Sequence, residues 1–243
     1  MGGGLLLWTG CASSYRVPEL ARSLVSVLKA LGVDYQCLGR DEGCCGSILL
    51  RLGFKEEFSR VAEDTANKIW STGAEGLVTH CPGCMRTFKL DYPREIKDLG
   101  LEIRHSTEVI SEHAKPSSLK PLELKVVYFD PCHLGRHLNV YEPPRHLLSM
   151  VPGLKVVEPE ESKEESLCCG AGGGIRGYFK ELAQAVAREL LDYFKSLGAE
   201  AVVTACPFCY YNFKTASDDS IRVLDVLQVV RASLEGRAHG GLV

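Results

Sequence analysis

Apolar residues along the first half of the chain recur in two alternating patterns. A short apolar run, Leu5 to Thr9, precedes apolar positions spaced by three and four from Val17 to Leu31, and Gly32 follows them. This order predicts a buried strand and then a helix with one apolar face that ends at the glycine. The same patterns predict a strand, a helix and a strand further on, at Tyr35 to Leu38, Phe54 to Ile69 and Leu77 to Thr79.

The second half repeats this order. It has a predicted strand at Val126 to Phe129, a helix from Phe179 to Phe194 and a strand at Ala201 to Thr204. Strands that alternate with helices favour α/β units built on a parallel sheet. The segment 115–125 carries two prolines and two serines and is the predicted linker. The predicted domains are therefore 1–118 and 119–243.

The two halves are also similar in sequence. STGAEGLVTHCPGCMRTFK (71–89) aligns without gaps with SLGAEAVVTACPFCYYNFK (196–214), and 11 of the 19 positions are identical. Such self-similarity indicates a duplicated unit. The predicted fold class is α/β, a tandem repeat of two similar parallel-sheet domains related by internal pseudo-symmetry.

Ten of the eleven cysteines follow this repeat. Each half has one cysteine after its first strand, then Cys-Cys-Gly, then Cys-Pro-x-Cys after a later strand. The first cysteine set is Cys11, Cys44, Cys45, Cys81 and Cys84, and the second cysteine set is Cys132, Cys168, Cys169, Cys206 and Cys209. The remaining Cys37, on a predicted strand, is expected to be a buried inert thiol.

Composition and charge narrow the classes of partner. Lys and Arg (28) nearly balance Asp and Glu (31), and no basic stripe is interleaved with aromatics, so nucleic acid is not an expected partner. No apolar run reaches the roughly 18 residues of a membrane helix. LLLWTGCASS (5–14) resembles a lipoprotein signal ending at Cys11, but no charged segment precedes it and its apolar run is too short. We expect a cytoplasmic protein that reaches a membrane only through a partner.

Soft thiolates in this number select zinc, copper(I) or iron–sulfur clusters. Structural zinc sites and ordinary cubane clusters both take four ligands, so five cysteines in each half favour an unusual cluster. Cys-Pro-x-Cys after a strand is also typical of dithiol redox motifs, and this alternative and zinc stay open at this point.

The complete cysteine pattern resembles the CCG motif of heterodisulfide reductase catalytic subunits, and YFDPCHLGRHLNVYEPPRHLL and SLCCGAGGGIR resemble the C-terminal CCG domain of the D-type subunit. The resemblance implies that each cysteine set binds a noncubane 4Fe-4S cluster, and that a small-molecule disulfide is reduced between the two clusters. No Cys-x-x-Cys-x-x-Cys segment precedes the first motif, which resembles the B-type architecture. The implied partners are a ferredoxin-like iron–sulfur subunit and a flavoprotein subunit.

Several other residues are predicted to serve this site. Backbone N–H groups at Gly46, Gly170 and Gly172 are expected to approach the cluster sulfurs, which is favoured over a phosphate cradle at GAGGG. His133 is a predicted proton donor for disulfide cleavage, and Arg136 a predicted anion-binding group. No role is predicted for His80, which aligns with Ala205.

The sequence thus predicts an iron–sulfur oxidoreductase subunit of the heterodisulfide reductase type. The alternative is an electron-transfer subunit for a flavin-linked dehydrogenase of lactate, glycolate or another 2-hydroxy acid. A third possibility is a zinc-stabilised scaffold.

Overall fold

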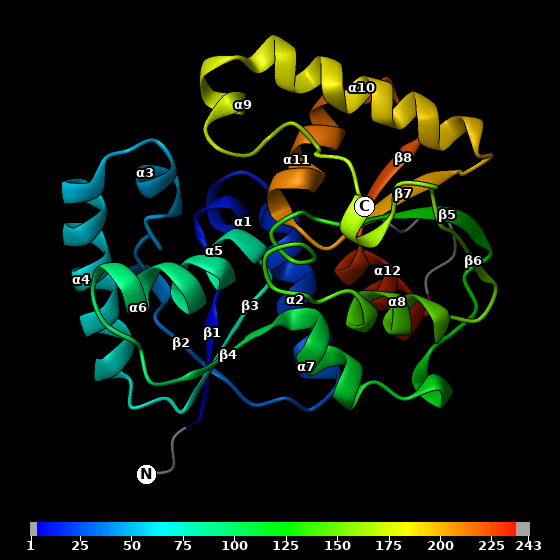
Figure 1. Cartoon of the computed structure of the whole chain (residues 1–243). Helices are drawn as coiled ribbons and strands as arrows, with labels where there is room; N and C mark the ends of the chain where they lie inside the picture. Colours follow the sequence, from blue (N-terminus) through cyan, green and yellow to red (C-terminus); the bar gives the residue numbers. More distant parts are fainter. Residues whose placement is uncertain (1–3, 237–243) are drawn as a thin grey trace.

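The computed structural model of the chain describes residues 4–236, and these form two four-stranded parallel sheets (Figure 1). The first sheet has the order β2-β1-β3-β4 and the second the order β6-β5-β7-β8. Their strands are β1 (Leu5–Trp8), β2 (Gln36–Cys37), β3 (Gly76–Thr79), β4 (Glu102–His105), β5 (Leu124–Phe129), β6 (Leu154–Val157), β7 (Ala201–Thr204) and β8 (Arg222–Asp225). The predicted fold class, two similar parallel-sheet α/β units in tandem, is confirmed.

Helices connect the strands and cover the sheets. The first half contains α1 (Cys11–Tyr15), α2 (Pro18–Ala30), α3 (Ser47–Arg51), α4 (Lys55–Ser71), α5 (Pro82–Arg86), α6 (Tyr92–Glu95) and α7 (Ser106–His113). The second contains α8 (Glu142–Ser149), α9 (Ile175–Tyr178), α10 (Lys180–Ser196), α11 (Pro207–Ala216) and α12 (Val226–Glu235). Among the described residues, no helix has the length and apolar character needed to cross a membrane.

The elements predicted from apolar spacing are found at nearly the predicted positions. The helix predicted after the first strand is α2, and Gly32 beyond its end has a φ of 68°, a conformation that glycine adopts without strain. Each half also contains a fourth strand and a final helix that apolar spacing did not reveal: β4 with α7, and β8 with α12.

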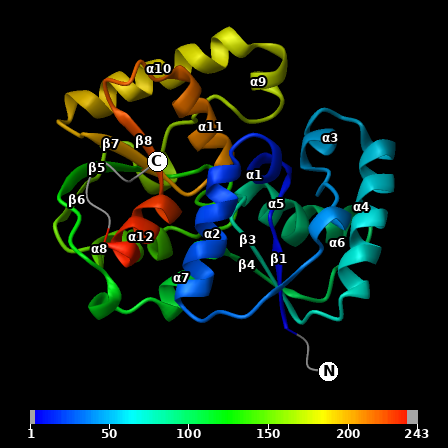
Figure 2. The same cartoon turned by 180° about the vertical axis from the view of Figure 1, so that it is seen from behind.

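Four helices lie between the two sheets and join the halves. Helix α2 of the first half packs on α12 of the second, and α8 of the second half packs on α7 of the first (Figures 1 and 2). Helices α2 and α8 follow the first strand of their halves, and α7 and α12 follow the last, so the two contacts are equivalent under the internal repeat. One continuous cluster of buried apolar side chains includes residues of both sheets, so the halves share a core. The predicted boundary at residue 118 falls at the end of a short turn, Pro116–Ser118, between α7 and β5.

Cys37 is not buried, and that prediction is wrong. It lies on β2, a two-residue strand at the edge of the first sheet, where both residues are exposed. An edge strand pairs with a neighbour on one side only, so an apolar sequence pattern does not imply burial there.

Candidate functional site

The strand ends determine where the cysteines lie. Cys11 starts α1 shortly after β1 ends, and Cys81 is the residue before α5, which follows β3. Cys206 has the matching position before α11, which follows β7. Proline at the first helical position of α5 and α11 fixes the start of each helix. Since the carboxyl ends of parallel strands share one edge, each half brings its cysteines to that edge of its own sheet.

A single cavity between the halves gathers both cysteine sets. All ten cysteines contribute to its lining, together with residues of both halves such as Arg51 and His133. Cys45, Cys81, Cys84, Cys169, Cys206 and Cys209 are buried, and Cys11, Cys44 and Cys132 are half-buried. Cys168 is exposed. The two sets therefore face a common space, and the second set also reaches solvent directly.

Within each set the side chains contact one another in the same order. In the first set Cys11 contacts Cys44, Cys44 contacts Cys45, Cys45 contacts Cys84 and Cys84 contacts Cys81. In the second set the corresponding order is Cys132, Cys168, Cys169, Cys209 and Cys206. The repeat thus preserves the spatial arrangement of the sulfurs as well as their spacing in sequence.

The acid–base properties of the thiols show what these sites require. Hydrogen bonds from Cys11 and Cys45 lower the pKa of Cys44 to about 2, and those from Cys132 and Cys169 lower the pKa of Cys168 to about 2. The same contacts, burial and the neighbouring charge raise the pKa of Cys11 and of Cys132. One thiolate thus suppresses ionisation of its neighbours, and five thiolates together require a positively charged group among them. Iron–sulfur clusters supply such charge, so the donor set fits them.

Two glycines are required by the backbone beside the paired cysteines. Gly46 and Gly170 have φ of 79° and 85°, and each donates its N–H to the sulfur of the first cysteine of its pair at 3.4 Å. A Cβ at Gly46 would lie 2.7 Å from the ring of Phe58, and one at Gly170 would lie 3.1 Å from the carbonyl oxygen of Ala183. A third glycine of the predicted set, Gly172, lines the cavity.

The first half also buries a hydrogen-bond donor without a partner next to its cysteines. The indole Nε1 of Trp8 is inaccessible and makes no hydrogen bond. A Cβ built on Gly10 would lie 3.3 Å from Cys84 Sγ and 3.8 Å from Trp8 Nε1, so the indole and this sulfur flank the same glycine. An unsatisfied buried donor is costly and is satisfied once an acceptor occupies the neighbouring space. Among residues 4–236 no group of three or more His, Cys, Asp or Glu side chains is arranged to hold a single metal ion.

His133 and Arg136 have different surroundings. His133 lines the cavity, and burial and the charges of His137 and Arg51 lower its pKa to about 4. Arg136 is not among the residues lining the cavity. Its guanidinium donates to the carbonyl oxygens of Ser166 and Glu164, in the loop that leads to the second Cys-Cys pair. The predicted substrate role of Arg136 therefore stays a prediction, and the position of this side chain supports a role in holding that loop.

Arg51, which lines the cavity at the end of α3, was not predicted from the sequence. Its guanidinium is paired with the carboxylate of Asp91, which also accepts from Arg86 at 3.1 Å. Arg51 lies close enough to His133 and His137 to lower the pKa of both rings. The repeat carries no signal for this residue, because its partners, Asp91 in the same half and the two histidines in the other, are distant in sequence.

His80, for which no role was predicted, connects the two halves. Its Nε2 donates to the Asp225 carboxylate at 2.8 Å, and its Nδ1 lies 2.6 Å from Ser106 Oγ. All three side chains are buried. Asp225 also caps α12 by accepting from the N–H of Leu227 at 2.9 Å. His80, the residue before Cys81, therefore connects the first cysteine set to the N-cap of α12 in the other half.

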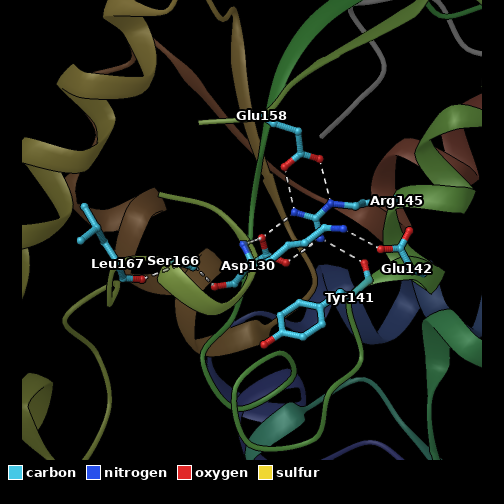
Figure 3. A network of polar contacts seen from close by, with 8 residues as sticks. Asp130, Tyr141, Glu142, Arg145, Glu158, Ser166 and Leu167 are labelled. Carbon is cyan, nitrogen blue, oxygen red and sulfur yellow. Dashed lines mark hydrogen bonds and ion pairs between the residues drawn. The ribbon is translucent and has the colours of Figure 1, made fainter. Parts of the chain in front are cut away.

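A second polar network fixes the loop ahead of Cys168. The guanidinium of Arg145 bonds to both carboxylate oxygens of Asp130, at 2.8 and 2.6 Å, and to both of Glu158, each at 2.8 Å (Figure 3). Asp130, directly after β5, also accepts from the N–H of Lys163 at 2.8 Å. Its carbonyl oxygen accepts from Ser166 Oγ at 3.0 Å. The acidic run 158–165 is thus anchored to the end of β5.

The fold and the site together define a class of protein: a duplicated α/β protein whose two halves present five cysteines each to one shared cavity. Residues 5–89 and 126–214 each match the family model of the cysteine-rich domain, CCG. The chain belongs to this family, as the cysteine pattern predicted.

Several proteins similar in sequence contain the same region within longer chains. The D-type chain of the dihydromethanophenazine:CoB–CoM heterodisulfide reductase of Methanosarcina acetivorans is 38% identical over 240 residues, which are 95% of this chain and 59% of that protein. A subunit of the CoM/CoB fumarate reductase of Methanothermobacter marburgensis is 30% identical over 94% of this chain and 46% of its own length. The EtfAB:quinone oxidoreductase of Syntrophomonas wolfei is 32% identical over 95% of this chain and 34% of its own. The chain thus spans less than two thirds of each of these relatives.

A solved structure supports the fold alone. A hypothetical protein from Helicobacter pylori superposes with a TM-score of 0.61, at 14% identity, over 98% of this chain and 50% of that chain.

Proposed function

We propose that this chain is an iron–sulfur oxidoreductase subunit that passes single electrons through two noncubane 4Fe-4S clusters to a disulfide. The observation that carries the proposal is the shared cavity, into which both complete cysteine sets face. In this proposal Cys11, Cys44, Cys45, Cys81 and Cys84 hold one cluster, and Cys132, Cys168, Cys169, Cys206 and Cys209 hold the other. The clusters, when bound, supply the electrons one at a time.

The protein supplies position and protons. Gly46 and Gly170 direct N–H groups at the proposed ligand sulfurs, and Gly172 lines the cavity. His133 faces the cavity and is the proposed source of a proton for the departing thiolate. Burial and the charges of His137 and Arg51 outweigh the nearby Asp91 and Cys168 and hold the pKa of its ring at about 4, so the ring is neutral at pH 7. Anionic cluster sites on both sides would favour the protonated ring and raise that pKa.

Relatives named as subunits of larger enzymes support a role within a complex. We infer that electrons arrive from a ferredoxin-like iron–sulfur subunit, with a flavoprotein further upstream. A cytoplasmic location, with any membrane contact through such a partner, belongs to the same proposal.

Anaerobic purification followed by iron and sulfide analysis tests the clusters. We expect about eight irons per chain, since each proposed cluster carries about four. Electron paramagnetic resonance of the oxidised protein with added thiols then tests disulfide chemistry, and a thiol-dependent signal is expected. About four irons would contradict the paired-cluster site. About eight irons with no response to any thiol would favour the electron-transfer subunit of a 2-hydroxy acid dehydrogenase.

A further inference from the structure

A groove beside the shared cavity, called here the basic groove, is lined by three cations, Arg16, Arg176 and Lys180, and by no Asp or Glu among the described residues. It runs between α1 and α3 of the first half and α9 and α11 of the second. In both views α1 lies below α9 and to one side of α3 (Figures 1 and 2). Cys11 lines the groove as well as the cavity, so the groove reaches the first cysteine set.

Large apolar side chains are exposed along the same groove. Tyr15 and Tyr178 line it with 83% and 68% of their surface exposed, and Ile48 joins them at 37%. Phe179, the residue before Lys180, and Leu182, two residues after it, are exposed at 59% and 55%. Contiguous exposed apolar surface with aromatic and arginine side chains is typical of protein interfaces.

The cations are held in two ways. Arg176 is fixed: its guanidinium bonds to Asn212 and to Thr215 Oγ1, and lies 4.2 Å from the centre of the Tyr211 ring. Arg16 and Lys180 are exposed. A fixed arginine beside two exposed cations gives a surface that is positive before any partner arrives.

The second cysteine set opens to solvent through a groove of opposite charge. The lining of that groove includes Cys168, Glu161 and Glu189, and no Lys or Arg among the described residues. A negatively charged protein is therefore attracted to the Cys11 side and repelled from the Cys168 side.

We propose that the basic groove is the docking surface for an acidic iron–sulfur electron-carrier protein, which delivers electrons to the first cysteine set by way of Cys11. The inference rests on the proposed function, because it takes Cys11 as a cluster ligand. It adds to that function a direction: electrons enter on the first half.

The test compares two double variants with the same change in charge. Arg16→Glu with Lys180→Glu reverses the exposed cations of the groove, and Lys29→Glu with Arg188→Glu reverses two exposed cations on α2 and α10 elsewhere. The probe is a reduced acidic bacterial ferredoxin, and the reading is the rate of cluster reduction in stopped flow. Reduction by dithionite, which needs no docking surface, serves as the reference for each protein.

At low ionic strength we expect the groove variant to be reduced by ferredoxin at least about tenfold more slowly than the control variant, with the difference lost in high salt. Dithionite rates should be equal. Binding of oxidised ferredoxin, measured by calorimetry, should weaken in the groove variant alone, and this reading does not depend on electron transfer or on disulfide chemistry.

Equal ferredoxin binding and equal ferredoxin rates in the two variants would overturn the proposal. So would a groove variant that dissociates a self-associated form of the wild-type protein in sedimentation, since the occupant would then be a second copy of the chain. If dithionite reduces no cluster in the wild type, the proposed function fails, while calorimetry still decides whether the groove binds the carrier.

Discussion

The two halves present equivalent cysteines but hold them with different side chains. In the first half Glu42, two residues before Cys44, accepts from the backbone N–H groups of Thr9 at 2.9 Å and Gly10 at 2.6 Å. This carboxylate ties the Cys-Cys loop to the segment ahead of Cys11. Burial raises the pKa of Glu42, and the hydrogen bonds from Thr9 and Gly10 offset only part of that rise.

In the second half the carboxylate lies on the other of the two connected segments, ahead of the first cysteine of the set and not ahead of the Cys-Cys pair. Asp130, two residues before Cys132, accepts from the N–H of Lys163 and is paired with Arg145, which also binds Glu158. Asp130 holds the acidic run 158–165, and Arg145 compensates the negative charge of Asp130 and Glu158. The comparison teaches that the repeat preserves the connection between two cysteine-bearing loops, while the residues that make the connection differ.

The strongest way to break the comparison is to remove one proposed cluster ligand from each half. Cys45→Ser and Cys169→Ser replace equivalent buried cysteines. Each variant should lose about half of its iron, about four of eight atoms, because in the proposed function each half holds its own cluster. Iron and sulfide analysis of anaerobically purified protein gives the measurement, and Cys37→Ser, at an exposed thiol outside both sets, should retain full iron. Complete loss of iron from either variant would mean that the halves do not load independently.

A smaller but still large effect is expected from removing either of these two carboxylate interactions, Asp130 with Arg145 or Glu42 with the N–H groups of Thr9 and Gly10. Asp130 is 2% exposed, so Arg145→Met leaves a buried carboxylate without its counter-charge, and the free energy of unfolding should fall by about 3–5 kcal/mol. Glu42→Gln keeps one acceptor oxygen and loses a charge-assisted bond, for a fall of about 1.5–3 kcal/mol. Anaerobic urea unfolding followed by circular dichroism measures both.

Arg145→Lys is the control for the Arg145–Asp130 pair, because it retains the charge without the bidentate geometry. Its free energy of unfolding should lie between those of Arg145→Met and wild type. Equal losses in Arg145→Met and Glu42→Gln would show that the second network adds nothing to a single carboxylate tie.

The central strands and the grouping of the two cysteine sets could be predicted from the sequence. Strands β1, β3, β5 and β7 lie inside their sheets and are largely apolar, with Lys125 of β5 as their one charged residue. The edge strands β4, β6 and β8 carry charged residues and are only partly buried, so their sequences show no clear period. The cysteine sets emerged because spacing is preserved between the halves.

The supporting residues could not be predicted, since their contacts join distant segments. His80 and Asp225 are separated by 145 positions, and His80 has no polar counterpart at Ala205. The error at Cys37 has the opposite cause: a local apolar pattern was interpreted without knowing that the strand forms a sheet edge.

The helix caps after β4 and β8 offer a comparison that depends on pH. His105 and Asp225 are the N-caps of α7 and α12, and each belongs to a capping box. Nε2 of His105 donates to the carbonyl oxygen of His80 at 3.0 Å, which leaves Nδ1 to accept from the N–H of Thr107. Burial and the neighbouring His80 lower the pKa of His105 well below 6.5.

The unfolded chain therefore binds a proton at His105 before the folded chain does. Above pH 6.5 this group leaves the free energy of unfolding unchanged, and below pH 6.5 that free energy should fall by up to about 1.4 kcal/mol per pH unit until the folded pKa is reached. His105→Asn keeps a capping acceptor that does not titrate, so its unfolding curve should lack this component. Identical slopes for the variant and wild type between about pH 6.5 and 5 would remove His105 as the cause.

The smallest expected effect concerns the two clusters themselves. Trp8 and Phe129 end the first strands of the two halves, and only Trp8 has an N–H, which is buried beside Cys84 without a partner. A donor directed at a cluster sulfur stabilises the reduced, more negative state. Trp8→Phe should therefore lower the reduction potential of the first-half cluster by about 40 mV, the equivalent of one hydrogen bond of about 1 kcal/mol for a one-electron couple. The Cys169→Ser background isolates this cluster for redox titration by electron paramagnetic resonance, and Cys45→Ser isolates the other, whose potential should stay unchanged when Trp8→Phe is added. Equal shifts in both backgrounds would assign the effect to packing around Phe88, which contacts Trp8 edge to face at 5.1 Å, and not to the lost donor.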